Sequence, residues 1–136
     1  MAIFETSASD FKFFCDAVLY WMERFGVTDW DVTFAHIRCK GIYAKVTYDV
    51  AGRQCEFVLD KKWPEQPTPW HLDRTALHEV KELELAKIRE STKSQRDEEA
   101  HVIIRRWENY LFGLCPPENP PQNYEHPVVA PQFKHR

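Results

Sequence analysis

The spacing of apolar residues changes twice along the chain, and this change most constrains the fold. Between Asp10 and Phe25 apolar side chains recur every three or four residues, which is typical of a helix with one buried face. From Trp30 to Leu59 the spacing falls to two, which is typical of strands. Beyond Pro69 the helical spacing returns. The order of helix, strands and helices predicts an α+β domain.

Three strands are predicted between the first helix and the second, at residues 30–35, 42–49 and 54–59. Apolar and polar residues alternate in each of them, so one face of the sheet is expected to be buried. The links at residues 38–41 and 51–52 are short and contain glycine. Such links favour hairpins, and the prediction is therefore a three-stranded antiparallel sheet.

Two further helices are predicted over residues 69–90 and 95–112. Residues that favour helix ends stand at the boundaries of the three helices: Ser7 or Ser9, Gly26, Thr68 with Pro69, Ser94 with Asp97, and Gly113. Residues 116–136 hold six prolines and no periodic pattern, which predicts an extended tail. The chain is therefore expected to form one domain over residues 1–115 with a tail at residues 116–136.

Composition and charge narrow the expected partners. The chain has 18 basic and 21 acidic residues and a net charge of -3, so no long-range positive field favours nucleic acid. No apolar stretch approaches the ~20 residues that span a bilayer, and the first residues lack the pattern of a secretory signal. The four cysteines are scattered, without a CxxC pair. These features predict a cytoplasmic protein with reduced thiols and with no membrane or nucleic-acid partner.

The predicted second helix carries a pair of metal-ligand residue types at helical spacing. His78 and Glu82 are four residues apart, so they lie one turn apart on nearly the same line of the helix. Two ligands placed in this way can hold one metal ion. Glu79 is rotated by ~60° from Glu82 and can reach a water molecule beside the pair.

The predicted third helix offers a further acidic ligand. Its expected apolar side consists of five residues: Val102, Ile103, Trp107, Tyr110 and Leu114. Glu99 falls within ~50° of the centre of that side, so it is expected to point toward the second helix. Glu98 and His101 fall ~150° from the same centre and are expected to face solvent. The candidate metal ligands are thus His78, Glu82 and Glu99.

The segment His78-Glu79-Val80-Lys81-Glu82 resembles an altered HExxH motif of the zincin metallopeptidases. Together with the preceding strands and the downstream Glu99, it is similar to the small metallopeptidases of phage and bacterial genomes in the minimal gluzincin and SprT-like group. The resemblance spans roughly residues 10–113 and implies a zincin-like fold. It further implies that His78 and Glu99 are metal ligands and that Glu79 is the general base. Glu82 stands where the family has histidine.

This departure affects the expected metal. A site of one histidine and two glutamates is harder and more negative than the family's site, so it favours zinc less and tolerates manganese or magnesium better. His36 and His71 are alternatives for the missing histidine, and both are also explained as ordinary surface or half-buried residues.

The resemblance implies a metal-dependent hydrolase that cleaves peptide bonds, with an extended peptide held along the exposed edge of the sheet. The alternative is a zincin-fold binding module whose site has decayed, because Glu82 replaces the histidine. A phage protein that interacts with a host protein, in the host cytoplasm, is a further alternative. The expected partner is a peptide or protein in each case.

Overall fold

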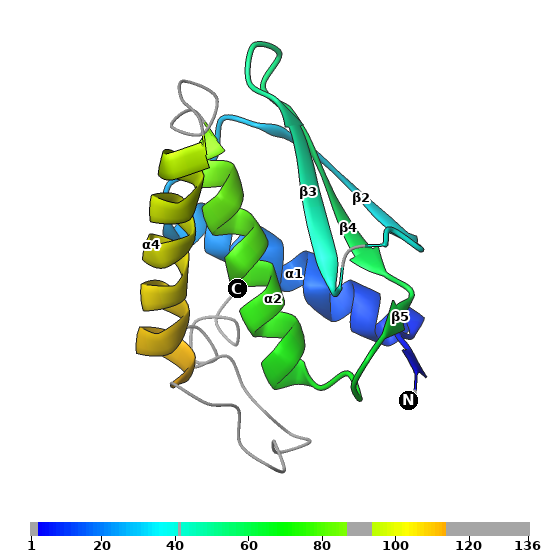
Figure 1. Ribbon diagram of the computed structural model, residues 1–136. Coiled ribbons are helices and arrows are strands. Elements are labelled where there is room, and N and C mark those ends of the chain that lie inside the picture. Colours follow the sequence, from blue (N-terminus) through cyan, green and yellow to red (C-terminus); the bar gives the residue numbers. More distant parts are fainter. Residues whose placement is uncertain (1–2, 41, 87–93, 114–136) are drawn as a thin grey trace.

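The computed structural model describes residues 3–40, 42–86 and 94–113, and within the last range it describes side chains from residue 101 onward. Three helices, α1 (Ala8–Arg24), α2 (Pro69–Glu84) and α4 (Ser94–Phe112), pack beside a small sheet. Helix α2 lies between α4 on one side and strand β3 (Ala44–Asp49) on the other, and it also packs against α1 (Figure 1). The predicted mixed α+β class is therefore confirmed.

The sheet differs from the predicted antiparallel meander. Strand β4 (Gln54–Asp60) lies in the centre, antiparallel to β3 and parallel to β2 (Asp31–Ile37). Only the β3–β4 hairpin is formed as predicted. The reason is burial, since β4 carries the consecutive buried residues Phe57, Val58 and Leu59, whereas β2 and β3 are half exposed. An apolar run of this kind suits a central strand that is covered on both faces.

Two short strands, β1 (Phe4–Glu5) near the start of the chain and β5 (Lys62–Trp63) just after β4, form a separate antiparallel pair. The predicted caps of the first two helices are present. Ser7 and Asp10 form a capping box at the start of α1, and Gly26 has a positive φ of 72° just after its end. Thr68 accepts a hydrogen bond from the His71 amide at the start of α2, as an N-cap before proline should.

Helices α1 and α2 are joined by a buried hydrogen bond. The indole Nε1 of Trp21 donates to Oδ1 of Asp73 at 2.8 Å, and both residues are almost fully buried. This bond satisfies the only polar atom of the buried Trp21 side chain and gives the buried carboxylate of Asp73 a hydrogen-bond donor. Leu77, Val80 and Leu83 are buried on the same side of α2. The line of residues 74, 78 and 82 is thereby turned away from the core and toward α4.

Helix α4 is rotated by roughly 140° from the predicted orientation. The residues that pack inward are Ile104, Glu108 and Phe112, with Phe112 against the rings of Trp21 and Trp70. The predicted apolar side is exposed at its four described members: Val102, Ile103, Trp107 and Tyr110. The prediction was wrong because it counted apolar residues alone, whereas the observed inner stripe contains a histidine and a glutamate.

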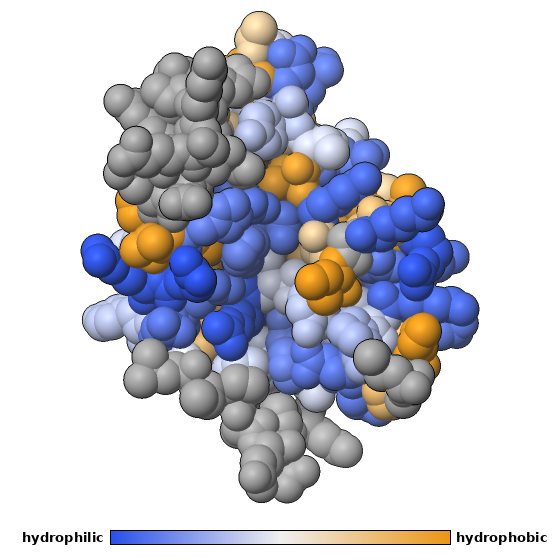
Figure 2. Space-filling view, viewed as in Figure 1, coloured by the Kyte–Doolittle hydropathy of each residue, from blue (hydrophilic) through white to orange (hydrophobic). Residues whose placement is uncertain are grey.

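No helix within the described ranges is long and apolar enough to cross a membrane. Hydrophilic side chains cover much of the face that carries α4 and β3 (Figure 2).

Candidate metal centre

Helices α2 and α4 bring two histidines and a glutamate together. His78 and Glu82 come from successive turns of α2, and His101 comes from the facing side of α4. Nε2 of His101 lies 3.0 Å from Oε1 of Glu82, and Nε2 of His78 lies 4.0 Å from Oε2 of the same carboxylate. One ligand atom from each residue can be chosen so that all three lie within 4.8 Å of one another.

These separations suit a metal ion without a large rearrangement. Zinc binds nitrogen and oxygen at about 2.0–2.2 Å, so ligand atoms around a tetrahedral ion lie about 3.4 Å apart. The observed 3.0 and 4.0 Å lie on either side of that value. All three residues are partly buried, which limits competition from bulk water. The donor set can therefore hold a divalent ion and leave a fourth position for water or substrate.

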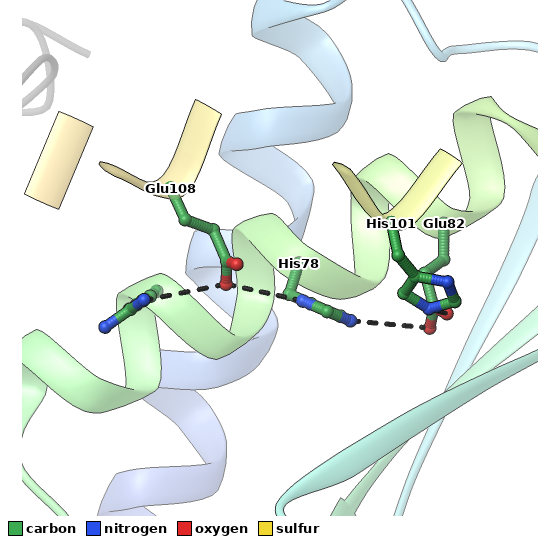
Figure 3. A network of polar contacts seen from close by, with 5 residues as sticks. His78, Glu82, His101 and Glu108 are labelled. Carbon is green, nitrogen blue, oxygen red and sulfur yellow. Dashed lines mark hydrogen bonds and ion pairs between the residues drawn. The ribbon is translucent and has the colours of Figure 1, made fainter. Parts of the chain in front are cut away.

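A buried carboxylate from α4 holds the first histidine from the other side. Oε2 of Glu108 lies 3.3 Å from Nδ1 of His78, and Glu108 is 7% exposed. Figure 3 shows His78 between Glu108 on one side and Glu82 with His101 on the other. A proton on Nδ1 that is donated to Glu108 leaves the Nε2 lone pair directed at the cluster. This is the arrangement by which proteins fix a metal-binding histidine.

The acidic residues around His78 raise its pKa by more than burial lowers it. Burial alone would lower the pKa of His78, but the hydrogen bond and charge of Glu108 and the charge of Glu82 raise it above its usual value. The positive charge of Arg74, whose Nε is 3.6 Å from Glu108, opposes this rise. The site thus has an excess of negative charge, which is what a bound cation neutralises.

Glu79 follows the first histidine and is 5% exposed. Burial raises its pKa well above the usual range, and the nearby carboxylates of Glu82 and Glu108 raise it further. Its Oε1 is buried and has no hydrogen-bond partner among the described residues. A buried carboxylate oxygen without a partner is costly, so it marks a position where a further group is expected to bind.

A cavity of about 520 Å³ opens beside the cluster. His78, Glu79 and Glu108 line it on the helix side, and the residues leading into β3 line it on the sheet side. Strand β3 is an edge strand, because its only sheet neighbour among the described strands is β4. The cavity therefore lies between one candidate metal ligand, His78, and the start of a strand whose other edge pairs with no described strand.

The predicted site residues have different outcomes. His78, Glu79 and Glu82 lie together, whereas the side chain of Glu99 is outside the described part of α4 and its role stays a prediction. The expectation that His101 faces solvent was wrong, since it contacts Glu82. Glu108 was not predicted. The signal for both was their seven-residue spacing, which puts them on one stripe of the helix.

The two alternative histidines do not join the cluster. Nε2 of His36 is 2.7 Å from Oγ1 of Thr6, and its ring stacks on Phe11 of α1. His71 lines the cavity, but its Nε2 faces Glu65 at 3.3 Å. The second histidine beside His78 and Glu82 is His101, not His36 or His71.

Comparison with family models, curated proteins and solved structures found no match for this chain.

Proposed function

We propose that this protein is a metal-dependent hydrolase that acts on peptide bonds, with the metal held by His78, Glu82 and His101. The observation that carries the proposal is the convergence of these three side chains from two helices, with their ligand atoms within 4.8 Å. The buried Glu79 beside them supports a catalytic role for the site rather than a purely structural one.

The donor set favours zinc. Two imidazoles and one carboxylate form the ligand set of several catalytic zinc sites. The sequence suggested a harder set of one histidine and two glutamates, for which manganese or magnesium would be better tolerated. The contact of His101 with Glu82 shifts our proposal toward zinc. The same donor types also bind ferrous iron, so metal identity belongs in the test.

The residues around the site have distinct tasks in this proposal. When bound, zinc acts as a Lewis acid toward a carbonyl group and lowers the pKa of water to about 7. Glu79 accepts the proton from the attacking water, and its unpartnered Oε1 is the acceptor atom. Glu108 keeps His78 in the required tautomer and orientation.

The cavity supports an extended peptide as the substrate. The unpaired edge of β3 can form main-chain hydrogen bonds to a strand that enters the cavity. Such bonds recognise peptide backbone, and they would place a scissile bond beside His78 and Glu79. Both features agree with the activity that the HExxE segment implied.

The test compares Glu79→Gln with Glu84→Gln on a mixed peptide library with zinc, manganese or ferrous iron added. Glu84 is on the same helix and pairs with Lys81. We expect Glu79→Gln to lose at least 100-fold in hydrolysis while metal binding persists, and Glu84→Gln to match the parent protein. Equal hydrolysis by parent and Glu79→Gln would refute the proposal. Metal binding without any hydrolysis would favour the binding-module alternative.

A further inference from the structure

Arg74 lies one helical turn before His78 and lines the same cavity. We propose that Arg74 selects substrates that carry a carboxylate next to the scissile bond. This inference rests on the hydrolase proposed above, which it makes more specific. Three observations support it: the position of Arg74, its unused donors, and the other partners of the nearby carboxylates.

The guanidinium of Arg74 is held in place but makes no hydrogen bond within the described part of the chain. Its side chain is 25% exposed, its Nε is 3.6 Å from Oε2 of Glu108, and its Cζ is 5.4 Å from the ring centre of Trp70. A guanidinium has five N–H donors in a rigid fork that fits a carboxylate through two parallel bonds. A fixed fork with unused donors is pre-organised for such a ligand.

The acidic residues that line the cavity have hydrogen-bond partners other than Arg74. Glu65 accepts a hydrogen bond from the hydroxyl of Tyr43 and faces His71 at 3.3 Å. Oε2 of Glu108 is hydrogen-bonded to His78, and Glu79 is hydrogen-bonded to the side chain of Glu82 and the backbone of Val46. None of these three carboxylates accepts a hydrogen bond from Arg74, since its contact with Glu108 is an ion pair at 3.6 Å. The donors of Arg74 are therefore available to the carboxylate of a ligand.

Arg74 is also the one permanent cation among the described residues that line the cavity. Glu65, Glu79 and Glu108 line the same cavity, so the attraction that Arg74 offers to an anionic ligand is local. A carboxylate is therefore expected to bind at the guanidinium itself and not elsewhere along the cavity.

The spacing limits where the carboxylate can be. The four residues from Arg74 to His78 span about 6 Å along α2, and we expect a group bound by Arg74 to lie at a similar distance from the metal ligand His78. Within a peptide, this corresponds to the residue that adjoins the scissile bond. Its carboxylate is either a free α-carboxylate at the chain end or the side chain of aspartate or glutamate. Both present the same chemistry to Arg74.

Three peptides that differ only in their carboxylates separate these sources. Acetyl-Ala-Ala-Asn has a free α-carboxylate, acetyl-Ala-Ala-Asp-amide has one on its side chain, and acetyl-Ala-Ala-Asn-amide has none. Binding is measured by calorimetry, with zinc-loaded and with zinc-free protein. We expect one of the two acidic peptides to bind on the order of 10- to 100-fold more tightly than the amide peptide.

Variants assign this preference to Arg74. Arg74→Gln should abolish it, and Arg74→Lys should retain part of it, because lysine keeps the charge but not the fork. Arg53→Gln is the matched control. Arg53 also lies over a tryptophan, with Cζ 5.0 Å from the Trp30 ring, and pairs with Asp29 at 3.3 Å, away from the cavity. The control should keep the full preference.

The outcomes distinguish this inference from the proposed function. Equal binding of all three peptides by the parent protein, or an unchanged preference in Arg74→Gln, would overturn the role of Arg74 and leave the metal site standing. Failure of the protein to bind zinc would overturn the proposed function. The preference for a carboxylate would still be measured with the zinc-free protein, where it is expected to disappear in Arg74→Gln.

Discussion

Glu108→Gln is expected to weaken metal binding although Glu108 is not a proposed ligand. The substitution keeps the shape of a buried side chain and removes the charge that faces Nδ1 of His78 at 3.3 Å. Loss of a carboxylate that orients a metal-binding histidine costs about 10- to 100-fold in affinity, or about 1.4–2.7 kcal/mol. Competition with a chromophoric zinc chelator at fixed pH measures the ratio of dissociation constants directly.

The cavity contains a matched control for this prediction. Oε2 of Glu65 also lies 3.3 Å from a histidine nitrogen, Nε2 of His71, but His71 is outside the metal cluster. Glu65→Gln therefore removes one charge from the same cavity and should change zinc affinity by less than about twofold. An unchanged affinity in Glu108→Gln, or an equal loss in both variants, would refute the reasoning that Glu108 acts through His78.

Three further predictions concern the framework around the site. Lys81→Ala should lower the free energy of unfolding, measured by urea denaturation, by about 2 kcal/mol. The reason is that Nζ of Lys81 lies 3.5 Å from the ring centre of Phe25 and 4.6 Å from that of Trp107. A loss below about 0.5 kcal/mol would contradict this cation–π contribution. Gly26→Ala should lower the free energy of unfolding by about 1 kcal/mol in the same assay, because the φ of residue 26 is 72° and alanine is strained there. No atom lies within 4 Å of an added Cβ, so the loss would come from the backbone alone, and an unchanged stability would contradict this reasoning. Burial raises the pKa of Cys55 to about 11, so its alkylation at pH 8 should be about 100-fold slower than that of an exposed thiol; an equal rate by mass spectrometry would show that it is accessible.

The sequence predicted the elements of the fold better than their arrangement. Local signals marked both ends of α1 and the start of α2 correctly, because a cap such as Ser7 or Thr68 acts only on its own helix. The predicted end of the second helix at residue 90 was wrong, since α2 ends at Glu84. The order of the strands depends on contacts between distant residues. The short link after β2 suggested a hairpin, but burial of Phe57, Val58 and Leu59 placed β4 in the centre.

The candidate site was predicted on α2 and missed on α4 for a related reason. His78, Glu79 and Glu82 lie within five residues of one helix, so helical geometry alone relates them. The rotation of α4 depends on what its neighbour presents. Because α2 presents a polar stripe, α4 turns His101 and Glu108 toward it and leaves apolar residues such as Tyr110 exposed. The assumption that the most apolar face of a helix is the buried one therefore fails where two helices meet through polar side chains.

X-ray absorption at the zinc edge tests the central claim most directly, because multiple scattering counts the imidazole rings bound to the metal. The account predicts one bound zinc per chain with two imidazoles, from His78 and His101, and one imidazole in His101→Ala. A single imidazole in the parent protein, unchanged in His101→Ala, would contradict the account. That result would instead favour the set of His78, Glu82 and Glu99.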